Sequence, residues 1–91
     1  MNYKITRTDK YLKKLIKFLK THPNLQTKYE KTIELLEINP HHPSLRLHKL
    51  QGNLNGFFSI SIDLSYRILI DFIITDKEII LLDIGTHDEV Y

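Results

Sequence analysis

The chain has 91 residues, of which 42% are hydrophobic and 26% charged, and its formal net charge is +2. This composition is typical of an ordinary globular protein, and we expect a single domain over residues 1–91. No apolar run approaches the roughly 18 residues of a membrane span, none follows the first charges as in a signal peptide, and cysteine is absent. We therefore expect a cytoplasmic protein with no membrane partner.

The small net charge hides an asymmetry along the chain. Residues 1–50 contain eleven Lys and Arg against four Asp and Glu, whereas residues 51–91 contain two against seven. A basic half is compatible with binding to phosphate backbones. The same lysines also fit a solvated helix surface, so charge alone does not decide whether the protein binds nucleic acid.

A short strand and then a helix are predicted at the start of the chain. Residues 3–6 alternate as a strand does, and Thr6 with Asp9 resembles a capping box. A helix is therefore expected to begin near residue 8, and its leucines and isoleucine recur at helical spacing. It should stop at His22, because a proline follows and disfavours helix there.

A second amphipathic helix follows and should end at Asn39-Pro40. Its apolar stripe consists of Leu25, Tyr29, Ile33 and Leu36. Two helices joined by a tight connection form an antiparallel hairpin. Residues 39–56 then lose all periodicity, and we expect a long irregular connection of the kind that often carries function.

The remaining chain changes to a period of two. Strands are predicted over 57–62, 66–74 and 78–85, with turns at 63–65 and 76–77. The expected architecture is therefore an α+β fold with the order β-α-α-β-β-β, in which the helical hairpin packs on one face of a small, mainly antiparallel sheet.

The second of these strands has two chemically different sides. The side expected to face the core carries Tyr66, Ile68, Ile70, Phe72 and Ile74. The opposite side carries Arg67, Leu69, Asp71 and Ile73. Because helices are expected on one face only, Arg67 should point to an open face, with the 39–56 connection and the C-terminal tail at the strand ends beside it.

Five histidines raise the question of a metal site. None has a zinc-like spacing, and the adjacent His41 and His42, flanked by prolines, fit a surface loop better. The glycines of residues 51–56 match neither a Walker loop nor a dinucleotide fingerprint, and no serine stands in a nucleophile-elbow context. We expect neither a metal nor a cofactor.

The chain does contain the residue types for metal-free RNA cleavage. Attack by the 2′-hydroxyl needs a base, an acid for the leaving 5′-oxygen, cations for the phosphate and an aromatic platform for a nucleobase. Imidazole suits acid or base work near neutral pH, and guanidinium matches phosphate oxygens. The candidates are His48, Lys49, Arg67, His87 and Tyr91.

Each candidate also has an ordinary structural explanation. Arg67 fits an ion pair with Asp71 or Asp83 equally well, and His48 fits a plain loop residue. The last seven residues, GTHDEVY, fit a solubilising tail, because chain ends fray unless something fixes them. The residues alone leave these alternatives open.

The second half of the chain contains a recognisable set of motifs. His48, Leu50, Gly52 and Gly56 form a segment H-x-L-x-G-x-x-x-G before the meander. A strand with an arginine follows, and the chain ends in G-[ST]-H-x-x-[LV]-[FY]. With these motifs the chain resembles the RelE/ParE superfamily of bacterial type II toxins, and in particular its YafQ-like mRNA interferases. The resemblance is specific over roughly residues 45–91, whereas the helical half matches in pattern only.

The resemblance implies a toxin that enters the ribosomal A site, cuts mRNA there and is neutralised by a cognate antitoxin. The free toxin is expected to be monomeric. The residues expected to act in catalysis are His48, Arg67, His87 and Tyr91. The residues expected to bind substrate are Arg46, Lys49, Ser61, Asp63 and Ser65.

Two positions depart from the YafQ-like pattern. Ser61 stands where these toxins carry a second histidine, and Ser65 where they carry an aspartate, although Asp63 lies nearby. The acid–base pair cannot therefore be copied from the family. We assign the role of general acid to His87. The candidates for the general base are His48 and Lys49.

Two other functions fit the same fold. The ParE branch poisons DNA gyrase and cuts no RNA, and a degenerate toxin would keep antitoxin binding without activity. The terminal histidine and tyrosine favour the nuclease over the gyrase inhibitor, while the acidic C-terminal half is unusual for a ribosome-binding toxin.

Overall fold

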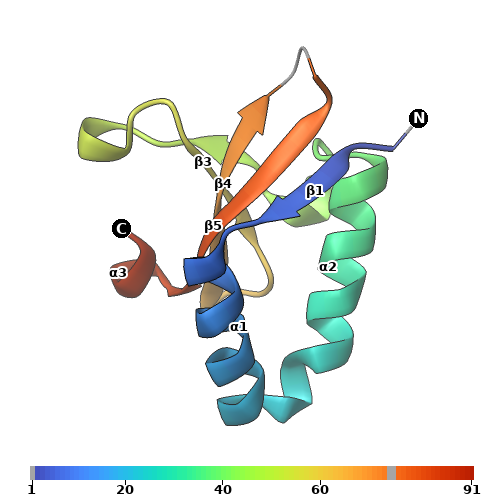
Figure 1. Cartoon of the computed structure of the whole chain (residues 1–91), viewed down its shortest axis with the longest axis vertical. Coiled ribbons are helices and arrows are strands. Elements are labelled where there is room, and N and C mark those ends of the chain that lie inside the picture. Colours follow the sequence, from blue (N-terminus) through green and yellow to red (C-terminus); the bar gives the residue numbers. More distant parts are fainter. Residues whose placement is uncertain (1, 74–75) are drawn as a thin grey trace.

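One five-stranded sheet, in the order β1-β5-β4-β3-β2, forms the centre of the molecule (Figure 1). The computed structural model describes residues 2–73 and 76–91. The strands are β1 (Lys4–Arg7), β2 (His48–Lys49), β3 (Phe58–Ser61), β4 (Tyr66–Ile73) and β5 (Glu78–Thr86). β1 runs parallel to β5, and the other neighbours pair antiparallel. The α+β class and the mainly antiparallel sheet are thus confirmed.

Two long helices and one short helix accompany the sheet. The helices are α1 (Asp9–Thr21), α2 (Gln26–Ile38) and α3 (His87–Val90). Three 3₁₀ turns are η1 (Pro23–Leu25), η2 (Pro43–Leu45) and η3 (Gly52–Leu54). The hairpin of α1 and α2 and the end of α2 before Asn39 agree with the sequence. No helix in the described part of the chain has the length and apolarity needed to cross a bilayer.

The start of α1 differs from the prediction in its capping residue. Thr8, and not Thr6, is the N-cap, and its hydroxyl accepts a hydrogen bond from the Tyr11 N–H at 3.1 Å. Thr6 lies within β1, where its hydroxyl donates to the Glu78 carboxylate at 2.8 Å. The pairing of β1 with β5 keeps Thr6 extended, so the helix begins two residues later than a cap at Thr6 would require.

The α1–α2 hairpin covers one face of the sheet, which we call the hairpin face. The main core lies between them and includes Ile68 and Ile70 of β4, both completely buried. Tyr11 of α1 and Tyr29 of α2 join their hydroxyls at 2.7 Å inside it. Burial raises the pKa of both phenols, so they pair as neutral groups. Ile74, which the sequence also predicted to face this core, lies outside the described residues.

The opposite face, which we call the α3 face, is less open than the sequence suggested. Leu50, Leu69 and the Val90 side chain of α3 form a second buried apolar cluster there. In Figure 1, α3 and the 50–56 segment lie on the side of the sheet away from α2. The connection predicted as irregular also contributes β2, which adds a fifth strand at the edge of the sheet.

Candidate active site

The register of the strands determines which predicted residues share the α3 face. Arg67 on β4 lies opposite Ser61 on one side and Gly85 on the other. Directly opposed residues point to the same face of a sheet, so all three lie on the α3 face. His48 on β2 is opposite Ser59 of β3, two residues before Ser61, and therefore faces the same way.

Lys49 does not share this face. It is opposite Phe58, whose ring packs against the main core, so Lys49 lies on the hairpin side of the sheet edge. Successive residues of a strand alternate between the two faces. Of the two candidates for the general base, His48 is therefore the one on the same side as Arg67.

Arg67 is half-buried, and its guanidinium donates to the Ser61 hydroxyl at 2.6 Å. Neither of its suspected carboxylate partners binds it. Within residues 2–73 and 76–91 the ion pairs are Lys14 with Asp83 and His87 with Asp88. Within the described residues Arg67 thus makes no ion pair, although its side chain is half-buried.

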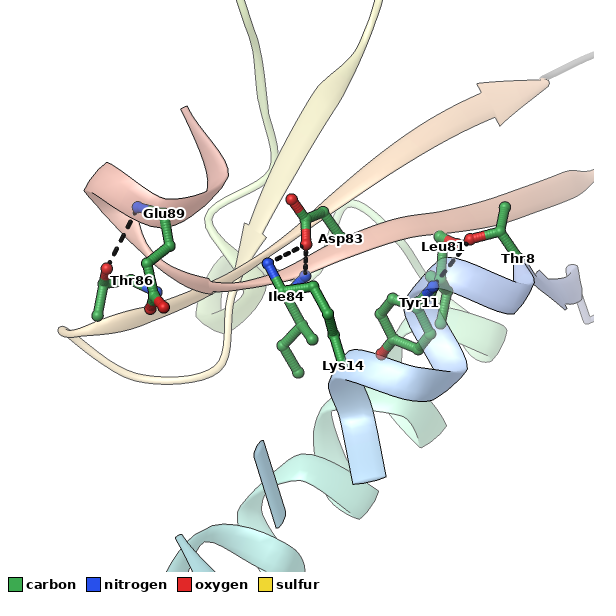
Figure 2. A network of polar contacts seen from close by, with 8 residues as sticks. All are labelled: Thr8, Tyr11, Lys14, Leu81, Asp83, Ile84, Thr86 and Glu89. Atoms are coloured by element: carbon green, nitrogen blue, oxygen red, sulfur yellow. Dashed lines mark hydrogen bonds and ion pairs between the residues drawn. The ribbon is translucent and has the colours of Figure 1, made fainter. Parts of the chain in front are cut away.

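Asp83 is paired with Lys14 and not with Arg67. The Lys14 ammonium reaches over from α1 and meets the Asp83 carboxylate at 2.5 Å (Figure 2). Asp83 is only 7% exposed and also accepts from the Ile84 N–H at 2.9 Å. A buried carboxylate needs such partners to stay charged. Nothing in the sequence singled out Lys14, because it is one of many similar lysines on α1.

His48 is exposed, and its ring has a defined orientation. Its Nδ1 lies 3.2 Å from the Arg46 carbonyl oxygen. A carbonyl can only accept, so Nδ1 carries the proton in this contact and the neutral ring has its lone pair on Nε2. In this tautomer Nε2 is the ring nitrogen that can accept a hydrogen bond.

The tail is an ordered helical turn and not a frayed end. Thr86 and Glu89 form a capping box, in which the Thr86 N–H donates to the Glu89 carboxylate at 2.9 Å (Figure 2). This bond lowers the pKa of Glu89. A Cβ at Gly85 would stand 3.0 Å from that carboxylate, so a glycine lets the turn pack closely. The spacing of Thr86 and Glu89 matches the capping-box pattern, so the sequence contained a signal for this turn that we did not use.

His87 is the first residue of α3, and Tyr91, one turn later, is the residue that follows it. Their rings meet edge to face, with centroids 4.3 Å apart, and the His87 side chain is 64% exposed. Tyr91 also lines a hollow of about 220 Å³ with the loop residues Leu50 and Leu54. The tail and the 48–56 segment therefore border one another, as the sequence analysis expected from their places at the strand ends.

The other three histidines have structural contacts. The His22 ring packs between Phe18 and Tyr66, and the His41 ring packs against Phe72. The His42 Nδ1 accepts from the Ser44 N–H at the start of η2. In the described ranges no three His, Asp or Glu side chains gather as a metal site requires.

The predicted substrate-binding residues differ in exposure and in contacts. Arg46 and Lys49 are exposed cations, and Ser61 is the buried partner of Arg67. Asp63 instead holds the β3–β4 turn, because its carboxylate accepts from the N–H groups of Ser65 and the following tyrosine at 2.9 and 2.8 Å. Ser65 is exposed in that turn.

Comparison with known families identifies the family of the chain. The model of the ParE toxin of the type II toxin-antitoxin system parDE matches residues 6–91. The chain therefore belongs to this family of toxins within the RelE/ParE superfamily, and the resemblance drawn from residues 45–91 is confirmed. No curated protein sequence matches the chain.

Solved structures share the fold over nearly the whole length. YafQ from E. coli strain BL21(DE3) is 19% identical with a TM-score of 0.78, covering 98% of each chain. A copper-bound mutant toxin from Helicobacter pylori is 24% identical with a TM-score of 0.74, covering 98% of this chain and 99% of that one. In the YoeB–YefM complex from Staphylococcus aureus the match is 18% identical with a TM-score of 0.73, covering 96% and 99%.

Proposed function

We propose that the chain is the toxin of a type II pair and that it cleaves mRNA in the ribosomal A site, without a metal or cofactor. The observation that carries this proposal is Arg67, a half-buried guanidinium that binds Ser61 and no carboxylate within the described residues. Such a group on the face shared with His48 suits the phosphate that gains charge during cleavage.

The proposed chemistry is an internal transfer at phosphorus. His48 Nε2 takes the proton of the 2′-hydroxyl, and the 2′-oxygen attacks the phosphorus. The bond to the 5′-oxygen breaks, and His87 gives this oxygen a proton, which leaves a 2′,3′-cyclic phosphate. Arg67 stabilises the negative charge on the phosphate, and the Tyr91 ring holds a nucleobase by stacking.

A cognate antitoxin is the proposed protein partner. The Staphylococcus aureus YoeB, which shares this fold, is paired with YefM in its structure. We propose the same kind of pairing for this chain, with a free toxin that is monomeric and cytoplasmic. An inactive toxin that keeps only antitoxin binding is the outcome expected if the chain binds its antitoxin and arrests no growth.

A gyrase inhibitor is the second candidate, because the matching family is named for ParE. That function needs a binding surface and no acid–base pair. Exposed His48 and His87 on elements that border one face favour the nuclease, since a pure inhibitor has no use for them.

The test is primer extension on a reporter mRNA after induction of the toxin, with translated and untranslated versions of the same message. The proposal expects new 5′ ends within codons of the translated message only. It also expects cleavage to continue in EDTA, a control that matters because a toxin of this fold binds copper. Intact mRNA with gyrase-linked DNA damage would establish the second candidate instead.

A further inference from the structure

A cavity of about 320 Å³ lies between α2, η2 and the β3–β4 turn. Three cations line it, Lys28 and Lys31 from α2 and Arg46 from the end of η2. These belong to the basic half of the chain, and the sequence analysis assigned no role to the two lysines. The volume lies within the range of small-molecule pockets, and three positive charges around it favour an anionic ligand.

The cavity adjoins Arg67. Ser61 lines the cavity and is also the residue whose hydroxyl accepts from the Arg67 guanidinium. Arg46 and Ser61 both line this cavity. The cavity and the proposed phosphate site therefore share one buried serine.

Arg46 holds an unusual backbone conformation at this point. Its φ of 50° and ψ of 46° are left-handed, a region that residues other than glycine seldom occupy. Residues in such backbone conformations cluster at functional sites, which makes Arg46 a candidate for a functional role. Its guanidinium is exposed at the mouth of the cavity.

The wall of the cavity is partly apolar. Leu35 and Ile62 line it, and Leu64 at its rim is 78% exposed, which is high for so large an apolar side chain. Asp63 also lines the cavity, but one oxygen of its carboxylate accepts two backbone N–H groups of the turn. An apolar wall beside cations suits a nucleobase with its phosphate better than a bare anion.

We propose that this cavity binds the nucleotide next to the scissile phosphate, with Lys28, Lys31 and Arg46 on the RNA backbone and Leu64 against the base. The inference rests on the proposed function and extends it to a second subsite. RNA is favoured over an acidic peptide because Ser61, which lines the cavity, is also the residue that binds Arg67.

The experiment measures binding without cleavage. A fluorescein-labelled 2′-O-methyl RNA hexamer has no free 2′-hydroxyl to attack, and its anisotropy gives Kd for the free full-length toxin at several salt concentrations. The test variant is Lys28→Gln with Lys31→Gln. The matched control is Lys10→Gln with Lys13→Gln, which removes the same charge from exposed positions of α1.

The test pair should weaken binding at least tenfold at low salt. Each lost phosphate contact lowers the slope of log K against log salt by about 0.7 for single strands, so two contacts should lower it by about 1.4. Leu64→Ser should weaken binding and leave the slope unchanged. The control pair should keep the wild-type slope.

Equal affinity and slope in the test and control pairs would overturn the subsite. A test variant that loses binding of a labelled hexaglutamate but keeps binding of the RNA hexamer would also overturn it, because that result indicates an acidic-peptide site. Primer extension separates the two proposals. If the test pair loses hexamer binding but the wild-type toxin cuts no mRNA, the cavity is kept as an RNA-binding site and the nuclease is removed. If the wild-type toxin cuts mRNA and the test pair binds the hexamer as well as the wild type does, the nuclease is kept and the subsite is removed.

Discussion

The two sides of β4 differ in polarity and in burial. On the hairpin face, Ile68 and Ile70 are fully buried in one continuous apolar core. On the α3 face, Arg67 and Asp71 are half-buried, and the apolar cluster around Leu69 covers only part of the surface. The first face supplies stability, and the second leaves charged groups within reach of a ligand.

The difference between the two faces shows how a small sheet can accommodate a polar site. A guanidinium at a half-dry surface is costly unless it is hydrogen-bonded, and Ser61 provides that bond. Asp83, one of the two carboxylates considered as partners of Arg67, is paired with Lys14 instead.

His87→Ala should have the largest effect on activity. If His87 is the general acid, its loss should slow mRNA cleavage about 10²- to 10⁴-fold, with little change in the free energy of unfolding because the side chain is exposed. The control is Lys10→Ala, at an exposed position of α1. Cleavage rates from primer extension that fall equally in both variants would remove His87 from the mechanism.

Ile68→Ala tests the other side of β4. It should lower the free energy of unfolding by about 3 kcal/mol, because it opens a cavity in a fully buried part of the core. Urea unfolding measures this, with Arg67→Ala as the comparison, for which we expect a loss below about 1 kcal/mol. Similar losses at both positions would mean that the α3 face is core as well.

Tyr91→Ala should have a smaller effect on activity than His87→Ala. Stacking on an aromatic ring contributes about 1–3 kcal/mol per base, so RNA binding should weaken about 5- to 150-fold. Tyr91→Phe keeps the ring and should behave like the wild type. Unchanged cleavage kinetics in Tyr91→Ala would show that the ring contributes only its contacts with His87 and the 50–54 loop.

Ser59→Ala should have the smallest effect and the opposite sign. The Ser59 hydroxyl is completely buried and has no hydrogen-bond partner within the described residues. Its removal should raise the free energy of unfolding by about 1 kcal/mol, measured by urea unfolding. Ser61→Ala removes a hydroxyl that has a partner, and a similar gain there would contradict this distinction between the two serines.

Periodicity in the sequence predicted the helical hairpin, the meander and the two sides of β4. It did not predict β2, because two residues are too short to show a period and pair only once β3 is in place. The choice of Thr8 over Thr6 as the cap depends on the pairing of β1 with β5, which is a contact between distant parts of the chain. Local sequence patterns do not reveal contacts between residues that are far apart in the chain.

The candidate site was predictable in its residue types and less so in its arrangement. Placing His48 and Arg67 on one face follows from strand register, and the same register sets Lys49 on the other. The Lys14–Asp83 pair joins α1 to β5 and left no trace in the spacing of either residue. The roles of His48, Arg67, His87 and Tyr91 stay predictions.

The most direct test of the account is the cleavage rate of Arg67→Ala on a translated reporter mRNA in a purified translation system. Lys13→Ala, which removes an exposed cation from α1, is the matched control. The account predicts that Arg67→Ala cuts at least about 100-fold more slowly while it keeps the wild-type circular dichroism spectrum and loses less than about 1 kcal/mol of the free energy of unfolding. A folded Arg67→Ala toxin that cuts as fast as Lys13→Ala would contradict the claim that the α3 face is an active site.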